Sequence, residues 1–268
     1  MTAEDKTVIA NFLGLASDFI RDGHKRNCPT IQSSSDDFTS LPLAYQIDEI
    51  AEVDSSTDSW ESNSVESYSA ESDSLETIAA DIRCCKACAL ASTRTNTVPG
   101  EGVNHPLVMV IGEGPGADED MAGRPFVGKA GQLLDKMLQS IGLFRNKNCF
   151  IANVVKCRPP GNRDPEAEET SACSTFLERQ IRLLRPQVIL CAGRVAAQNL
   201  LKTSMGIKAL RGEFVEFRLI STTKLTSEEI IIPVLCIFHP SALLRDESLK
   251  RPAWEDLKLL KSRLEERD

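Results

Sequence analysis

The fold of this chain is decided by the stretch Leu107-Val108-Met109-Val110-Ile111-Gly112-Glu113-Gly114-Pro115-Gly116. Its first five residues are all apolar, which is the pattern of a strand that is buried on both faces of a parallel sheet. The glycine-rich turn that follows is typical of a loop that approaches a ligand at the carboxyl end of such a strand. The stretch therefore favours an α/β protein with a binding site beyond this strand.

The sequence around this stretch alternates between apolar strand patterns and helical patterns from residue 81 on. Further strands are expected at residues 150–155, 188–192, 214–217 and 230–238, and helices at 132–141, 167–184, 193–201 and 254–264. This alternation predicts a three-layer α/β/α sandwich around a mostly parallel sheet. Three segments with unusual composition would lie at carboxyl ends of its strands, namely 112–116, 153–157 and 239–241.

The composition of the chain changes near residue 80. Residues 1–80 hold four basic and sixteen acidic side chains, a net charge of −12, whereas residues 81–268 carry 27 basic and 23 acidic ones. We expect an acidic N-terminal extension over 1–80, with one amphipathic helix near residues 8–20 and a disordered linker rich in Ser, Asp and Glu. The catalytic or binding domain would then occupy 81–268, and its mildly basic charge permits a polyanionic ligand.

Four of the nine cysteines, Cys85, Cys88, Cys157 and Cys173, have the spacing of metal ligands. Cys85 and Cys88 form a C-x-x-C pair, and the other two come from a distant part of the chain. A centre of several thiolates from separate segments favours an iron–sulfur cluster over a zinc ribbon, which usually has two short knuckles. Cys84 is an alternative to Cys85, because a C-x₃-C pair with Cys88 is also possible.

Cysteine use also bears on the compartment. Nine is an odd number and too few for a disulfide scaffold of 268 residues, which favours a reducing environment. The N-terminus lacks the charged and apolar regions of a secretory signal, and no stretch approaches the roughly 18 apolar residues of a membrane span. We therefore expect a cytoplasmic protein without a membrane partner.

Two glycine-rich segments formally satisfy nucleotide-binding patterns. Gly112-x-Gly114-x-x-Ala117 fits a dinucleotide fingerprint, but Pro115 removes a backbone N–H, and no second strand supplies an acid for the ribose. The segment 123–130 has the spacing of a phosphate loop, but Ala130 replaces the hydroxyl that binds magnesium. Neither segment therefore predicts a nucleotide site.

Five motifs in a fixed order resemble those of the family 4 uracil-DNA glycosylases, which carry an iron–sulfur cluster. They are Cys85-x-x-Cys88, Gly112-Glu113-Gly114-Pro115-Gly116 with Glu119-Asp120, Gly123-Arg124-Pro125-Phe126-Val127-Gly128, Asn153-Val154-Val155-Lys156-Cys157-Arg158-Pro159-Pro160-Gly161-Asn162-Arg163 and His239-Pro240-Ser241. The match covers about residues 81–265. Family members commonly have alanine where this chain has Gly114, and the minimal family domain has no counterpart of the acidic extension.

The resemblance implies a central sheet of four mostly parallel strands, a [4Fe-4S] cluster on Cys85, Cys88, Cys157 and Cys173, and excision of uracil from single- or double-stranded DNA. The implied uracil-binding residues are Glu113, Gly114, Glu119, Phe126, Asn153 and His239, of which Glu113 and His239 are catalytic. Phe126 would stack on a flipped base, Asn153 would read its edge, and His239 would donate to uracil O2. Ser241 and Arg245 would contact DNA.

Three alternatives remain open at this point. They are a non-catalytic DNA-binding module, a redox-sensing module of the same fold, and a glycosylase that has broader specificity or traps DNA covalently. The joint presence of Glu113, Phe126, Asn153 and His239 argues against the first, since a binding module does not need all four. We further expect a monomer that associates with the nucleoid when it binds DNA. The sequence leaves three roles open for the helix of the N-terminal extension, namely docking on the core, binding an unknown protein partner, or neither.

Overall fold

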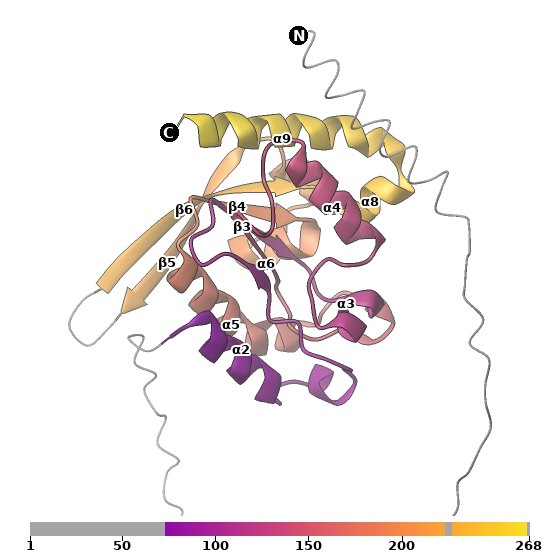
Figure 1. Cartoon of the computed structure of the whole chain (residues 1–268), viewed down its shortest axis with the longest axis vertical. Helices are drawn as coiled ribbons and strands as arrows, with labels where there is room; N and C mark the ends of the chain where they lie inside the picture. Colours follow the sequence, from indigo (N-terminus) through magenta and orange to yellow (C-terminus); the bar gives the residue numbers. More distant parts are fainter. Residues whose placement is uncertain (1–72, 223–226, 267–268) are drawn as a thin grey trace, which may run out of the picture.

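The computed structural model describes residues 73–222 and 227–266, which form a six-stranded sheet with helices on both faces (Figure 1). The strand order is β1-β3-β2-β4-β6-β5. Their bounds are β1 Glu101–Gly102, β2 Val108–Gly112, β3 Cys149–Asn153, β4 Val188–Ala192, β5 Phe214–Thr222 and β6 Ser227–Ile237. The helix expected near residues 8–20 and most of the expected linker lie outside the described residues.

The four central strands β3, β2, β4 and β6 are parallel, as the resemblance implied. The sheet is wider than four strands, because β1 and β5 pair antiparallel at its two edges. β1 has two residues, too few to show a periodic pattern in the sequence. β5 was expected as a shorter strand over 214–217, and its pairing with β6 extends it to Thr222.

Alternating side chains of the central strands enter two separate cores. Val108 and Val110 of β2 point to one core, while Met109 and Ile111 point to the other. The first core is covered by α4 Lys129–Gln139, α8 Pro240–Arg245 and α9 Lys250–Glu265, and the second by α5 Ala167–Leu184 and α6 Arg194–Leu201. Short helices lie in the connections, α3 Ala117–Ala122, α7 Ile207–Leu210 and the 3₁₀ turns Ala89–Ser92, Pro160–Asn162 and Glu247–Leu249. The three predicted layers are therefore present.

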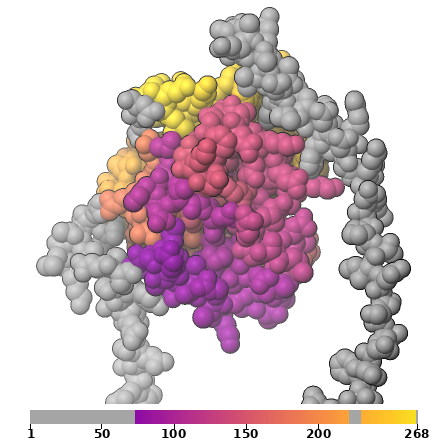
Figure 2. All heavy atoms as spheres, viewed as in Figure 1, coloured from indigo at the N-terminus to yellow at the C-terminus, as the bar shows by residue number. Residues whose placement is uncertain are grey.

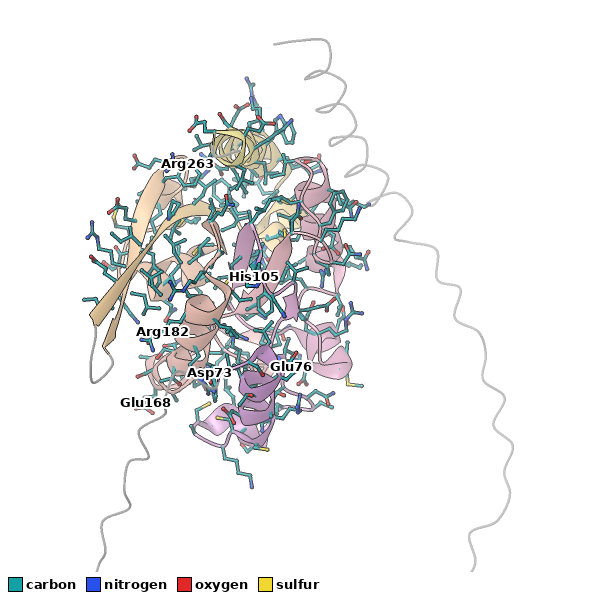
Figure 3. All side chains as sticks on the ribbon, turned by 60° about the vertical axis from the view of Figure 1, so that its left-hand side comes forward. Asp73, Glu76, His105, Glu168, Arg182 and Arg263 are labelled. Carbon is teal, nitrogen blue, oxygen red and sulfur yellow. The ribbon has the colours of Figure 1, made fainter. Side chains whose placement is uncertain are left out.

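The first helix of the described chain is α2, Leu75–Cys84, which packs against α5. The Ser74 side chain caps it by accepting from the backbone N–H of Thr77 at 3.1 Å. The guanidinium of Arg179 in α5 forms two ion pairs with this region, with Asp73 just before α2 at 2.6 Å and with Asp81 within α2 at 2.8 Å. Figure 3 shows Asp73 and Glu76 at the start of α2. The boundary expected at residue 80 thus falls inside a helix, and the folded unit reaches back to at least Asp73.

Figure 2 shows one face of the folded unit, with α2 and the residues that follow it (indigo to purple) in its lower part and α9 (yellow) at its top. Between residues 73 and 266, leaving aside 223–226, no helix has the length and apolar character that crossing a bilayer requires.

Candidate active site

The carboxyl ends of the four parallel strands meet at one pocket of about 660 Å³. β3 ends at Asn153, directly paired with Gly112 at the end of β2, and β6 leads into His239. The pocket is lined by all eight residues predicted for base recognition, catalysis or DNA contact, namely Glu113, Gly114, Glu119, Phe126, Asn153, His239, Ser241 and Arg245. Segments that are up to about 130 positions apart are brought together because parallel strands end at the same edge of a sheet.

The floor of the pocket is formed by Asn153 and Phe126. Asn153 is 1 % exposed, and its Oδ1 is buried without a hydrogen-bond partner. Gly112 lies between the two side chains, so that a Cβ atom there would be 2.4 Å from Oδ1 of Asn153 and 2.5 Å from Cζ of Phe126. Only glycine leaves room for this arrangement. A buried acceptor without a donor costs free energy, and a ligand with a suitably placed N–H would satisfy it.

Phe126 is held in a left-handed backbone conformation, with φ of 52°. The carboxylate of Glu119 fixes the turn after it by accepting from the N–H groups of Val127 and Gly128, both at 2.9 Å. Its other oxygen accepts from the N–H of Gly116 at 3.1 Å. The resemblance implies that Glu119 binds uracil, through its backbone. The structure shows that its side chain joins the glycine-rich loop to the loop that carries the phenylalanine.

Arg145 holds the same turn from the opposite direction. Its guanidinium donates to the carbonyl oxygens of Pro125 and Phe126, each at 2.9 Å. Asp135 of α4 in turn pairs with Arg145 at 2.9 Å. The Phe126 ring is therefore positioned by bonds to the backbone on both sides of it.

His239 faces this ring, with 5.8 Å between the ring centroids. The pKa of His239 is lowered to about 4, chiefly by burial and also by the nearby Arg245, whereas Glu119 acts in the opposite direction. Nδ1 accepts from the backbone N–H of Ser241 at 3.2 Å and lies 2.8 Å from its hydroxyl. The ring is thus neutral at physiological pH, and its proton is on Nε2, free for donation.

The two other histidines do not enter the site. His105 is exposed and does not line the pocket, while His24 lies outside the described residues. Gly193, at the end of β4, has φ of +100°, and a Cβ there would lie 2.9 Å from Cβ of His239. Because Gly193 has no side chain, the end of β4 can run directly beside His239.

Glu113 is half-buried at the rim of the glycine-rich loop. The pKa of Glu113 is raised to about 6, chiefly by burial and also by the carboxylate of Asp164, while the guanidinium of Arg194 acts in the opposite direction. Asp164 and Arg194 form an ion pair with each other and also line the pocket. A carboxylate with its pKa close to neutral, next to a buried recognition site, is typical of a residue that acts on charge or protons.

The four predicted cysteine ligands line a second, small cavity between α2 and α5. The backbone N–H of Lys156 donates to Sγ of Cys173 at 3.3 Å, and the guanidinium of Arg94 donates to Sγ of Cys157 at 3.2 Å. Cys85 and Cys88 complete the lining. Donors of this kind stabilise thiolate sulfur.

Cys84, the alternative to Cys85, is exposed and does not line this cavity, which favours Cys85. Within the described ranges, no three side chains of His, Cys, Asp or Glu are arranged to hold a single metal ion as they stand.

Some residues around the site were not singled out from the sequence. Arg145 and Arg94 lie in segments without a motif, and their partners are known only from the fold. Arg194 follows the glycine that comes directly after a predicted strand, and this position could have identified it. Lys156 and Arg163 belong to a motif that was quoted, but the sequence gives no sign of which way their side chains point.

Comparison with known proteins gives consistent matches. The family model "Uracil DNA glycosylase superfamily" matches residues 99–258. A type-4 uracil-DNA glycosylase of Archaeoglobus fulgidus is 42% identical, over 69% of this chain and 91% of that protein. The type-4 enzymes of Sulfurisphaera tokodaii and Thermotoga maritima are 42% and 40% identical, each over 70% of this chain, and over 84% and 93% of their own lengths.

Proposed function

This chain belongs to the type-4 uracil-DNA glycosylases of the uracil-DNA glycosylase superfamily, and on that premise we propose how its pocket excises uracil. As a DNA glycosylase, it hydrolyses the N-glycosidic bond of uracil in DNA, leaves an abasic site and so initiates base excision repair. The observation that carries the assignment of the pocket is the buried Oδ1 of Asn153, which has no partner and lies beside the Phe126 ring.

Recognition of uracil follows from the chemistry of the floor. A flipped uracil stacked on Phe126 presents N3–H, which Oδ1 of Asn153 accepts, and O4, to which the Asn153 amide donates. Cytosine has an acceptor at N3 and an amino group at C4, so both pairings would be lost. The backbone groups of Gly114 and Glu119 supply further contacts to the base, since both residues line the pocket.

Cleavage breaks the bond between C1′ of the sugar and N1 of uracil. The bonding electrons leave with the base as a uracil anion, and the sugar becomes cationic. His239 donates its Nε2–H to uracil O2, where negative charge collects, and it does so as a neutral ring. The carboxylate of Glu113 stabilises the cationic sugar and orients the water that attacks C1′. The water loses one proton in that step, and the uracil anion is protonated after release.

We also propose that Cys85, Cys88, Cys157 and Cys173 hold a [4Fe-4S] cluster. Four cysteine thiols around one cavity, three of them with N–H donors to sulfur, are a donor set that suits iron–sulfur chemistry. When bound, the cluster would link the start of the folded unit to α5 and to the connection that precedes it.

The DNA itself would be held at the rim of the pocket. Arg245 donates to the Ser241 hydroxyl at 3.4 Å, and both side chains are accessible there. A guanidinium at this position suits a backbone phosphate. Action on single- and double-stranded DNA, a monomeric state, a protein partner of the N-terminal extension and a cytoplasmic location remain predictions.

The decisive experiment is incubation with a single-stranded oligonucleotide that contains one uracil, followed by alkaline cleavage at the abasic site. The wild-type protein should cleave it, and His239→Ala should be slower by about 10²–10³-fold, the usual effect of losing one anion-stabilising donor. His105→Ala is the matched control and should act at the wild-type rate, since His105 is exposed and remote from the pocket. A folded wild-type protein that produces no abasic site would disprove the proposal.

A further inference from the structure

Lys156 is a buried cation with neutral partners. Its side chain is 1 % exposed, and its Nζ donates to the carbonyl oxygen of Asn153 at 2.9 Å and to Oε1 of Gln180 at 2.7 Å. In the part of the chain that the structure describes, no carboxylate forms an ion pair with it. Lys250 offers a contrast, because it is also buried, at 4 % exposed, but its ammonium pairs with Glu247 at 2.8 Å.

An ammonium in the interior needs a negative charge nearby. Burial of an unpaired charge costs several kcal/mol, and hydrogen bonds to neutral oxygens offset only part of that cost. Lys156 lines the small cavity formed by the four cysteines, and its own backbone N–H donates to Cys173 at 3.3 Å. A cluster held by four thiolates carries net negative charge, so a group bound in this cavity would supply the missing anion.

The same ammonium reaches the other site of the protein. Its bond to the carbonyl of Asn153 holds the end of β3. The side chain of the same asparagine forms part of the floor of the uracil pocket. Gln180 of α5, which accepts the second bond, is itself fixed by donating to the carbonyl of Pro99 at 2.8 Å. The lysine therefore lies between the cysteine cavity and the base-reading residue.

We propose that Lys156 is a positioning residue with two roles. Its ammonium balances the negative charge of the cysteine-bound cluster, and its bond to the Asn153 carbonyl keeps the uracil-reading carboxamide in place. This inference rests on the cluster proposed above. It goes beyond that proposal because it assigns a residue that touches neither the iron nor the base.

The test compares Lys156→Met with Lys250→Met, each in the full-length protein purified with its iron. Loss of iron to a chelator should be about 10–100-fold faster in Lys156→Met, the usual effect of removing a partner of a metal ligand. The midpoint potential of its cluster should become more negative, because a nearby positive charge favours the reduced state. Its KM for uracil-containing DNA should rise roughly tenfold. Lys250→Met should match the wild type in all three measurements.

A second variant keeps the test informative if Lys156→Met does not fold. Gln180→Glu places a carboxylate beside the ammonium but leaves the lysine and its bond to Asn153, at the loss of the bond to Pro99. Gln180→Glu should also make the midpoint potential of the cluster more negative, with little change in KM. If Lys156→Met retains iron as the wild type does and has the same midpoint potential, the charge-balancing role is overturned. If Lys156→Met does not fold, the same result in Gln180→Glu overturns that role. An unchanged KM in Lys156→Met would overturn the positioning role. Wild-type protein without iron would instead refute the cluster itself.

Discussion

The pKa of Glu113 predicts the shape of the pH–rate profile. Burial raises this pKa to about 6, so the carboxylate is the main form at pH 7, whereas at pH 5 only about one-tenth of the molecules are ionised. If the carboxylate stabilises the cationic sugar, the rate of excision falls as pH drops through 6. Below that midpoint the rate should decrease about tenfold for each pH unit.

The neighbours of Glu113 provide the controls. Asp164 raises the pKa of Glu113 and Arg194 lowers it, so Asp164→Asn should move the midpoint to lower pH and Arg194→Met should move it to higher pH. Glu113→Gln should be slow at every pH and lack this limb of the profile. His239 does not interfere between pH 5 and 7, because its pKa is about 4 and its ring remains neutral.

The assay is single-turnover excision of uracil from a labelled oligonucleotide between pH 4.5 and 8, with enzyme in excess over DNA. Circular dichroism at each pH verifies that the protein is folded. A rate that is constant from pH 7 to pH 5 in folded protein would refute the assigned role of Glu113. So would a midpoint that moves to higher pH in Asp164→Asn.

Four further outcomes are expected. Asn153→Asp should weaken uracil excision, because a carboxylate cannot donate to O4 and repels the uracil anion; the measurement is the single-turnover rate, and an unchanged rate would contradict the reading role. Gly112→Ala should weaken uracil binding by roughly 10- to 100-fold, since the new Cβ would lie 2.4 Å from the Asn153 oxygen and overpacking costs about 1–3 kcal/mol. His239 should lower the free energy of unfolding by up to about 3 kcal/mol as pH falls from 6.5 to 4, because in this range only the unfolded state protonates the ring. In urea titrations, the free energy of unfolding of His239→Gln should therefore depend less on pH. Deletion of residues 1–70 should leave excision and melting temperature nearly unchanged, because it keeps every described contact of α2, from the ion pair of Asp73 with Arg179 onward. A large loss of activity would show that the extension belongs to the catalytic unit.

The regular elements with strong periodic patterns could be predicted closely from the sequence. α5 and β4 have the expected bounds, 167–184 and 188–192, since a long amphipathic pattern ends before Pro186 and an apolar run follows it. The sequence does not predict α2 because its first turn follows a segment rich in Ser, Asp and Glu, and part of what holds it is Arg179, about 100 positions away. Local composition contains no information about such a partner.

The site was predictable as far as parallel topology determines it. Motifs that follow parallel strands must meet at one edge of the sheet, and Asn153 and His239 do line one pocket. The residues that support them could not be inferred in this way. Arg145 reaches carbonyl oxygens 19 and 20 positions before it, and Lys156 reaches the Gln180 side chain 24 positions after it. These contacts depend on side-chain directions, which spacing along the chain does not specify.

The backbone of Phe126 shows why such supporting contacts matter for function. A bulky residue at φ of 52° is strained by roughly 1–2 kcal/mol, so the turn would relax if nothing held it. Glu119 binds the two N–H groups after the phenylalanine, and Arg145 binds the two carbonyl oxygens at and before it. Each bond of this kind to a charged group contributes about 1.5–3 kcal/mol, enough to offset the strain. The backbone conformation of Phe126 is therefore maintained by residues whose side chains need not touch uracil. Because this conformation is maintained, the Phe126 ring lies opposite His239, with space for a base at the floor of the pocket.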